Sequence, residues 1–447
     1  MHRLTRAIIL ELLSFSTVQN INLFVVGGTL RDYLLLKPGN DFDFTGKNAA
    51  EFGRSFSVHL NFTCISLDNT PGRNTVRVIL DQNQQLDFTD LQGRNIEEDL
   101  SQRDFTINAM GLSLKDFLGK RKDIIDPHNG QKDLINRKIR VLPGPIFQSD
   151  PLRILRAFRF AATLGFEIDK ETLGEISQHK SKIMETAQER IWHEMSLFFK
   201  APCTKLLLDL LHSTGLLGNI FPRSNKTYSR TSTQYENLEN LIQEPEKIFP
   251  EYSDELNTNG LDNNQYLLKV SVLLMGEIQD SVTETGSVEK PRPLSDQSWE
   301  LRPSNAETKF IDQTLNGAWY LAQGYAKKNL SLNEIYELIH TIQEEILASV
   351  FLFVSSLDSN DGNVTLFCNR IFEFYFHQYL PTINKKPLLN GEDIIREFDT
   401  PPSPLIGKIL YSTQKAHVLG DIATHDEAKV LAGEIIQSQK LGLKDDD

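Results

Sequence analysis

The feature that most constrains the fold of this chain is a twenty-residue stretch, VVGGTLRDYLLLKPGNDFDF, at positions 25–44. A β-rich run at 21–26 ends at the pair Gly27–Gly28, and a helical pattern follows directly. The DFDF segment at 41–44 then alternates with the period of a strand. Strand, glycine turn, helix and strand in this order predict a sheet that carries a glycine turn close to an acidic strand.

Three further segments repeat this alternation and extend the predicted sheet. They are TCISL at 63–67, TVRVIL at 75–80 and QLDF at 85–88, with helical patterns at 30–36 and 48–60 between the strands. About five strands make a sheet of ordinary size, so the first part of the chain predicts one domain of mixed α and β structure.

After about residue 140 the strand pattern fades and helical periodicity dominates. Residues 279–306 are polar and contain proline, which is typical of a long loop or linker. A chain of 447 residues is too long for a single core, so two to four domains are expected. The pattern predicts a head built on a sheet, followed by a long all-α arm.

Charge is unevenly distributed along the chain. The formal net charge is −13, which argues against a protein that coats nucleic acid without specificity. Residues 120–159 nevertheless contain ten lysines and arginines, beginning with Lys120 and Arg121, and only four aspartates. A cationic segment within an acidic chain indicates a site for an anionic ligand.

Nothing in the sequence predicts a membrane segment or an oxidising compartment. No stretch has the roughly 20 unbroken apolar residues of a membrane helix. The N-terminal run resembles a signal peptide, but Glu11 interrupts it and no small-residue cleavage site follows, so an amphipathic helix is predicted. Cys64, Cys203 and Cys368 form neither a metal spacing nor a disulfide framework. A cytoplasmic protein without a membrane partner is expected.

Asp41 and Asp43 lie two residues apart on a predicted strand, so their carboxylates project from one face. Paired oxygen ligands suit Mg²⁺, which takes one or two carboxylates together with substrate phosphates. Asp87 has apolar neighbours on another predicted strand. If the two strands are adjacent, three carboxylates would hold two metal ions about 4 Å apart. The alternative is an acidic solvent-facing surface, which a bare Asp-x-Asp pattern does not exclude.

Gly27 and Gly28 end a strand immediately before a helix. Glycine lets backbone amides approach a phosphate closely, and the start of a helix favours anions. Arg31, about one helical turn further on, would add a charge-assisted bond to a triphosphate. An ordinary turn is the alternative, but the short distance to the aspartates favours a joint phosphate and metal site.

The segment NIEEDLSQRDFTINAM at 95–110 contains Arg103, Asp104 and Asn108. Asn95 and the glutamate three residues later fit a capping box, so the acidic cluster at its start is interpreted as structural. The arginine has no such explanation, although single surface arginines are common.

The segment SDPLRILRAFRF at 149–160 predicts a helix that begins at its proline, which would make Asp150 the N-cap. Arg153, Arg156 and Arg159 recur every three residues and form a stripe along the helix. Their guanidinium groups repel one another unless an anion or acidic side chains pair with them. Asp150 and Arg153 together also offer an acceptor and donors that match the edge of a nucleobase.

Together these segments resemble the class II tRNA nucleotidyltransferases and bacterial poly(A) polymerases, within the polymerase-β-like nucleotidyltransferases. GGTLRD…DFDF is similar to motif A of that family, QRDFTINAM to motif B, and DPHNGQKDLINRKIRVL at 126–142 to motif C. SDPLR stands in the place of motif D, and ERIWHE at 189–194 is similar to motif E. The order and spacing hold over residues 23–200, with a looser match at 387–435.

The resemblance implies an α+β fold, with a nucleotidyltransferase head built on a roughly five-stranded mixed sheet and an all-α neck, body and tail behind it. The implied domains are a catalytic head at 1–140, a base-recognising neck at 141–200, a body at 201–330 and a tRNA-binding tail at 331–447. The implied reaction adds CMP and AMP, from CTP and ATP, to the 3′ end of tRNA.

The resemblance also implies roles for the candidate residues. Asp41 and Asp43 would bind Mg²⁺, and Asp87 would be a third catalytic carboxylate or a general base. The residues implied to bind the incoming nucleotide are Gly27, Gly28, Arg31, Arg103, Asp104, Asn108, Asp150, Arg153, Arg156 and Arg159. Asp150 and Arg153 would select C or A at the base edge, and the last helices would grip the acceptor arm of tRNA.

Three departures from the family pattern leave the specificity open. Ser149 replaces the usual glutamate of motif D, and Ser403 replaces a glycine in the tail. Only LQGRNI at 91–96 joins two motifs that a longer flexible loop separates in many relatives, which is reminiscent of the CC-adding subgroup. A CC-adding enzyme, a poly(A) polymerase and a catalytically inactive RNA-binding protein are therefore the alternatives.

Overall fold

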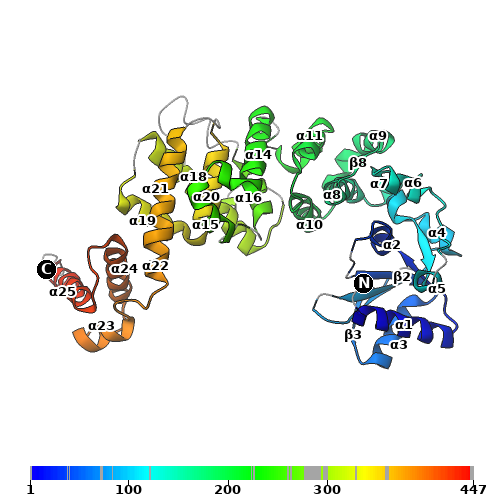
Figure 1. Ribbon diagram of the computed structural model, residues 1–447, viewed down its shortest axis with the longest axis horizontal. Coiled ribbons are helices and arrows are strands. Elements are labelled where there is room, and N and C mark those ends of the chain that lie inside the picture. Colours follow the sequence, from blue (N-terminus) through cyan, green and yellow to red (C-terminus); the bar gives the residue numbers. More distant parts are fainter. Residues whose placement is uncertain are drawn as a thin grey trace. The chain divides into compact units, whose positions relative to one another are not determined.

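The computed structural model describes residues 3–442 except 38, 40, 71–73, 83, 120–121, 223, 225–226, 259–260, 262–263, 276–292, 295–300, 328–329 and 358–361. Its two compact units are Met1–Asn219 and Ile220–Asp447 (Figure 1). Lys120, Arg121 and most of the predicted 279–306 linker lie outside the described residues. The four domains predicted from the sequence stay a proposal.

The first unit is built on a six-stranded sheet in the order β3-β4-β5-β2-β1-β6. The strands are β1 (Leu23–Val26), β2 (Asp41–Gly46), β3 (Thr63–Asp68), β4 (Thr75–Ile79), β5 (Gln85–Asp90) and β6 (Gly111–Ser113). Only β2 and β5 run parallel, so the sheet is mixed, as predicted. The sequence predicted five strands, because β6 has three residues and is too short to show alternation.

The two faces of this sheet differ in chemistry. Along β2, Phe42 and Phe44 are buried, whereas Asp41 is exposed and Asp43 is half-buried. Phe44 stacks on Phe88 of β5 with ring centroids 5.3 Å apart, and helix α3 (Ala49–Leu60) covers this aromatic face. Helix α1 (Arg3–Val18) packs on α3 (Figure 1). Alternation along one strand therefore leaves the aspartates on the face opposite the aromatic core.

Helix α2 (Gly27–Leu34) follows β1 without a connecting residue and packs on β2. Helix α8 (Arg153–Leu164) packs against α10 (Gln188–Phe199) beyond the sheet. The remaining described elements of this unit are α4 (Ile96–Leu100), a 3₁₀ turn (Thr106–Asn108), α5 (Leu114–Leu118), α6 (Gly130–Ile135), β7 (Lys138–Ile139), α7 (Ile146–Ser149), β8 (Glu167–Ile168), α9 (Lys170–His179), a 3₁₀ segment (Lys180–Glu185), α11 (Lys205–Ser213) and α12 (Leu216–Ile220).

The second unit contains helices and no strand among its described residues. Its helices are α14 (Tyr228–Gln243), α15 (Ser253–Thr258), α16 (Gln265–Leu274), α18 (Asn305–Ala326), α19 (Leu332–Ile342), α20 (Ile346–Ser355), α21 (Gly362–Phe374), α22 (Leu380–Ile383), α23 (Gly391–Phe398), α24 (Pro404–Leu419) and α25 (His425–Gly442). Helices α18 and α20 pack closely, since a Cβ on Gly317 would lie 2.2 Å from the Ser349 hydroxyl. The predicted all-α arm is confirmed for this described part, whereas the prediction of an all-α neck at 141–200 is wrong in one detail, because the two-residue strand β8 pairs there with β7.

One segment of this unit, Leu332–Ser355, is long and apolar enough to cross a membrane by length and composition. Its most apolar 18 residues have a mean hydropathy of 1.4, and 67% of them are buried inside the protein. It contains α19 and α20, and α20 packs on α18, α14 and α16. In this structure the segment lies in the core of the helical unit.

Candidate functional site

A cavity of about 670 Å³ lies in the first unit, between the acidic face of the sheet and helix α8. Twelve of the thirteen candidate residues line it. They are Gly27, Gly28, Arg31, Asp41, Asp43, Arg103, Asp104, Asn108, Asp150, Arg153, Arg156 and Arg159. The structure therefore brings together side chains that are more than 100 positions apart in the sequence.

The side chain of Thr29 in helix α2 is hydrogen-bonded to the acidic strand β2. The Thr29 hydroxyl accepts a hydrogen bond from the backbone N–H of Asp43 at 2.7 Å. The same hydroxyl lies 3.2 Å from the Asp41 carbonyl oxygen and 3.4 Å from the Asp43 carboxylate. This contact fixes the spacing between the glycine turn and the two aspartates.

The pKa values of both β2 aspartates are raised, so a nearby cation would stabilise their ionised forms. Burial raises the pKa of Asp43, and the neighbouring Asp87 carboxylate raises it further. Partial removal from water and Asp87 likewise raise the pKa of Asp41. An acid whose pKa is raised in this way is stabilised as its anion by any cation that arrives beside it.

Asp87 is the candidate residue that does not line the cavity. It pairs in register with Asp43 across the parallel β2–β5 ladder, so its position beside the acidic pair agrees with the sequence prediction. However, Arg77 of β4 donates to both of its oxygens, each at 2.8 Å. Within the described residues no cluster of three His, Cys, Asp or Glu side chains is placed to hold a metal ion, so the expected three-carboxylate arrangement is not formed.

The glycine turn lies directly against the charged groups. Gly27 has φ +62°, a conformation that side chains disfavour, and a Cβ there would lie 3.1 Å from Arg103 Nη1 and 3.4 Å from Asp43 Oδ2. A Cβ on Gly28 would lie 3.5 Å from Arg31 Nη2. The two glycines thus keep open the space between the acidic strand and two arginines, at the start of α2.

These residues fit a magnesium–triphosphate group. Asp41 and Asp43 supply two hard oxygen ligands, which is the number that Mg²⁺ commonly takes from a protein when substrate phosphates complete its shell. The space kept open by Gly27 lies beside them, with Arg31 and Arg103 at its edge. The donor set therefore suits Mg²⁺ bound together with phosphate.

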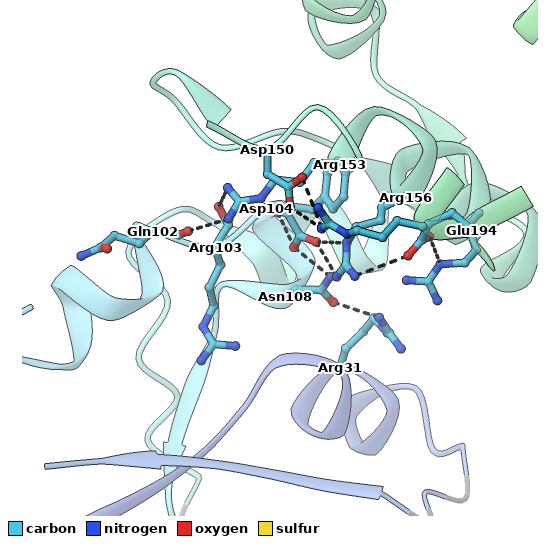
Figure 2. Close-up of polar contacts among 12 residues, drawn as sticks. Arg31, Gln102, Arg103, Asp104, Asn108, Asp150, Arg153, Arg156 and Glu194 are labelled. Carbon is cyan, nitrogen blue, oxygen red and sulfur yellow. Dashed lines mark hydrogen bonds and ion pairs between the residues drawn. The ribbon is translucent and has the colours of Figure 1, made fainter. Parts of the chain in front are cut away.

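Figure 2 shows a continuous polar network from α2 to α10. Arg31 Nη1 donates to Asn108 Oδ1 at 2.9 Å, and Asn108 Nδ2 donates to Asp104 Oδ1 at 3.2 Å. Asp104 then pairs with Arg156 at 2.7 Å. Glu194 completes the chain by accepting from Arg159 at 2.7 Å, with Arg156 3.8 Å away. The predicted repulsion within the arginine stripe is thus relieved by two acids from other elements.

The Asp104 carboxylate stays ionised despite its burial. Burial alone would raise its pKa, but Arg156 and the hydrogen bond from Asn108 hold the pKa below the ordinary value for aspartate. Asp104 and Glu194 together raise the pKa of Arg156 against the opposing effect of burial. The pair therefore remains charged at the wall of the cavity.

Asp150 and Arg153, the proposed base readers, sit at the start of α8. The helix begins at Arg153, two residues later than predicted, because Pro151 and Leu152 form a turn before it. Asp150 is therefore not the N-cap, although its Oδ1 accepts from the Leu152 N–H at 3.3 Å. Its carboxylate lies 3.3 Å from Arg190 of α10. Arg153 donates to the backbone carbonyls of the 102–103 segment (Figure 2).

Sequence reasoning missed several residues of the cavity wall. The Phe160 ring receives three guanidinium groups, with Arg159 4.2 Å, Arg31 5.2 Å and Arg156 5.3 Å from its centroid. Asp99, interpreted as structural, lines the cavity and pairs with Arg103 at 3.0 Å. The signal for Phe160 was present, since it directly follows the last arginine of the stripe.

The short connection between β5 and α4 is a compact turn. Gln92 N–H donates to Asp99 Oδ1 at 2.9 Å, and the Gln102 side chain donates back to the Gln92 carbonyl at 2.9 Å. Arg94 N–H donates to Glu98 at 2.8 Å. Asn95 is the N-cap of α4, but the predicted capping box is not completed, because the Glu98 carboxylate accepts from Arg94 and not from the Asn95 N–H. Residues 91–96, where many relatives have a longer loop, are thus held in place by hydrogen bonds to α4 and to the residues after it.

Comparisons with known proteins agree with this geometry. The Poly A polymerase head domain family matches residues 23–140, and the family described as "Probable RNA and SrmB- binding site of polymerase A" matches residues 165–226. A CC-adding tRNA nucleotidyltransferase of Geobacter sulfurreducens is 26% identical over 414 residues, covering 90% of both chains. The enzyme of the same name from Halalkalibacterium halodurans is 35% identical over 199 residues, covering 43% of this chain and 48% of the relative.

Solved structures show the same fold along almost the whole chain. A Thermotoga maritima CCA-adding enzyme complexed with tRNA matches with a TM-score of 0.65 and 23% identity, covering 98% of this chain and 95% of the other. A CCA-adding enzyme in complex with ATP matches with a TM-score of 0.67 and the same identity and coverage. The predicted nucleotidyltransferase fold is confirmed.

Proposed function

The chain belongs to the family of class II tRNA nucleotidyltransferases and bacterial poly(A) polymerases, and we propose that it adds nucleotides from CTP and ATP to the 3′ end of tRNA. One observation carries this proposal. A single cavity joins two strand-borne aspartates, a glycine turn at a helix start and a stripe of arginines. Two relatives that match the chain over most of its length are named CC-adding tRNA nucleotidyltransferases, and relatives named as CCA-adding match it over less than half.

In this proposal, the triphosphate lies over the Gly27–Gly28 turn, where the first backbone amides of α2 and the Arg31 and Arg103 side chains offset its charge. Asp41 and Asp43 would hold Mg²⁺, which neutralises phosphate charge and lowers the pKa of the attacking 3′-hydroxyl. The rigid spacing between the turn and β2 aligns the α-phosphate with that hydroxyl.

Helix α8, which carries the arginine stripe, is proposed to bind the nucleobase and ribose. Asp150 and Arg153 offer one carboxylate and one guanidinium at the mouth of the cavity, the pattern of acceptor and donors that distinguishes C and A from U and G. Arg156 donates a hydrogen bond to Asp104, and both side chains form the cavity wall next to this position. Because Asp104 and Asn108 also reach toward Arg31, base and triphosphate would be positioned by one network.

The helical second unit is proposed to bind the acceptor arm of tRNA, with the tail at 331–447. Helices α23, α24 and α25 share a small core that includes Leu389, Ile394 and Ile409. Phosphate contacts make such binding strongly dependent on salt concentration. Head, neck and body at 1–140, 141–200 and 201–330, and a cytoplasmic location, complete the proposal.

Incubation of the purified protein with tRNA that lacks its CCA end tests the proposed reaction. With Mg²⁺, CTP is expected to extend the tRNA by two residues, and ATP by one more once both cytidines are present. A single-stranded RNA of equal length is the matched control for a poly(A) polymerase. If neither RNA is extended under any nucleotide and metal condition, a catalytically inactive RNA-binding protein is the better description.

A CC-adding enzyme is the second candidate, and the compact turn between β5 and α4 favours it. Gly93 in this turn has φ +118°, and bonds from Gln92, Arg94 and Gln102 hold it in place. A turn tied down in this way leaves little chain to rearrange the pocket after the second cytidine. Extension by two residues with CTP and none with ATP would establish this candidate.

A further inference from the structure

The proposed reaction gives no role to Phe160 of helix α8, although its ring lies among three of the arginines proposed to bind the nucleotide. The guanidinium carbon of Arg159 lies 4.2 Å from the centre of the ring, that of Arg31 5.2 Å and that of Arg156 5.3 Å. Significant cation–π contacts occur roughly once in 70–80 residues of a protein, so three on one ring exceed the ordinary frequency. The cluster of Phe160 with these arginines is therefore a distinct feature of the cavity.

The ring of Phe160 is held firmly and is largely shielded from water. It lines the cavity but is only 6% exposed, and it makes an edge-to-face contact with Phe105 at a centroid distance of 5.7 Å. Phe105 is itself completely buried, and the Arg31 side chain is 10% exposed. A cation–π contact is stronger where the cation is removed from water. The position of the ring therefore favours strong contacts with the arginines.

Each of the three arginines also has an acidic partner. The pairs are Arg31–Asp32, Arg156–Asp104 and Arg159–Glu194, at 2.8, 2.7 and 2.7 Å. A guanidinium group is planar, so its N–H groups can bond to a carboxylate in the plane while an aromatic ring contacts its face. Each arginine is therefore held in two ways, by a carboxylate and by the ring of Phe160.

The same ring connects two parts of the cavity that are far apart in the sequence. Arg31 belongs to α2, beside the glycine turn, whereas Arg156 and Arg159 belong to α8. The polar network of Figure 2 is one connection between these two helices. Phe160 is a second and more direct connection, because one ring contacts the arginine of α2 and both arginines of α8.

We propose that Phe160 is a positioning residue whose ring holds Arg31, Arg156 and Arg159 in the arrangement that binds the nucleotide, and so couples the triphosphate part of the cavity to the base part. This inference rests on the proposed function, which assigns these arginines to the nucleotide. Like charges repel, so without the ring the three guanidinium groups are less well ordered before the nucleotide arrives. The nucleotide then binds more weakly, because part of its binding energy is used to order them.

Phenylalanine analogues that carry one, two or three ring fluorines at position 160 test the proposal. Fluorine withdraws negative charge from the face of the ring with little change of shape, so it weakens cation–π contacts stepwise. Calorimetry with Mg²⁺ and without RNA measures the binding of CTP and of inorganic tripolyphosphate while no nucleotide is transferred. Both affinities are expected to fall about twofold per fluorine, and F160L, which lacks the ring, should lower both about tenfold.

Phe158 provides the matched control. It lies on the same helix, is completely buried and does not line the cavity. Within the described residues no cation lies over its ring. The same fluorinated analogues at position 158 should change neither affinity by more than about 1.5-fold. Thermal unfolding of each variant shows whether it is folded.

Two results would overturn the proposal. Equal affinities across the fluorine series in folded protein would leave Phe160 with a packing role only. A fall for CTP without a fall for tripolyphosphate would show that the ring contacts the nucleobase and does not act through Arg31. A wild-type protein that binds CTP but extends no RNA would count against the proposed function, while the fluorine series would still decide the role of Phe160.

Discussion

Each unit of the protein contains an ion pair with the same 2.7 Å separation, and the two pairs have different surroundings. Asp104–Arg156 forms a wall of the cavity in the first unit, where Arg156 leaves 34% of its side chain exposed. Glu239–Lys269 joins α14 to α16 in the second unit, with 6% and 3% exposed. An ion pair that faces a cavity can act on a ligand, whereas a sealed pair acts only on the fold.

The largest expected effect tests the cavity side of this comparison. The substitution D43N should lower nucleotide transfer to tRNA by about 10³-fold, because it removes several kcal/mol of metal-dependent charge stabilisation in the transition state. The folded state should not suffer, since burial already disfavours the Asp43 carboxylate. Incorporation of labelled CMP measures nucleotide transfer, and thermal unfolding measures stability. A D43N variant that is clearly less stable than the wild type would contradict the prediction that Asp43 acts on transfer and not on the fold.

The sealed pair should show the opposite behaviour. K269M leaves the Glu239 charge buried without its 2.7 Å ion-pair partner, and removal of one member of a buried pair costs about 3–5 kcal/mol. Denaturant unfolding of the second unit should show this loss. The double variant K269M/E239L should recover most of it, because apolar side chains can replace a sealed pair. Transfer activity of the folded protein at low temperature should stay close to that of the wild type.

A weaker effect is expected for the pair at the cavity wall. D104N should lower kcat/KM for CTP by about 10- to 100-fold, since a hydrogen bond to a charged group contributes about 1.5–3 kcal/mol. Asp133 provides a matched control, because it is also buried and pairs with Arg140 at 3.2 Å but does not line the cavity. D133N should change kcat/KM by less than about threefold. Equal losses in both variants would indicate a purely structural role.

The smallest effect is a pH dependence of opposite sign at Asp43 and Asp104, measured without metal. The pKa of Asp43 is raised in the fold, so its ionisation destabilises the protein as pH rises from about 3.9 through the raised pKa. D43N should therefore be more stable than the wild type at pH 7 and lose this advantage on acidification toward pH 4. The pKa of Asp104 is lowered, so its ionised form stabilises the fold above its ordinary pKa, and D104N should be the less stable protein at pH 7.

The sequence predicted those parts of the site that depend on local periodicity. The position of both aspartates on one strand face follows from Phe42 and Phe44 alternating with them. The arginine stripe on α8 follows from its three-residue spacing. These features need no knowledge of which elements are neighbours in space.

The parts that could not be predicted depend on tertiary pairing. Arg77 and Asp87 face each other only because β4 and β5 pair in one particular register. Glu194 reaches the stripe from a helix 35 positions away from Arg159, and Glu239 meets Lys269 across 30 positions. In each case the sequence pattern around the charged residue is typical of an exposed surface position. Its partner is identified only when the packing of the two elements is known.

The Thr29 hydroxyl has a further consequence for how this architecture tolerates change. Because it bonds to β2 backbone at both Asp41 and Asp43, the phosphate turn and the acidic pair move as one rigid body. The chain that links α2 to β2 is therefore not needed to hold the turn beside the aspartates, although its Gly39 lines the cavity. Insertions in that link away from Gly39 should lower turnover less than loss of the hydroxyl at position 29, which should lower turnover with CTP and ATP alike.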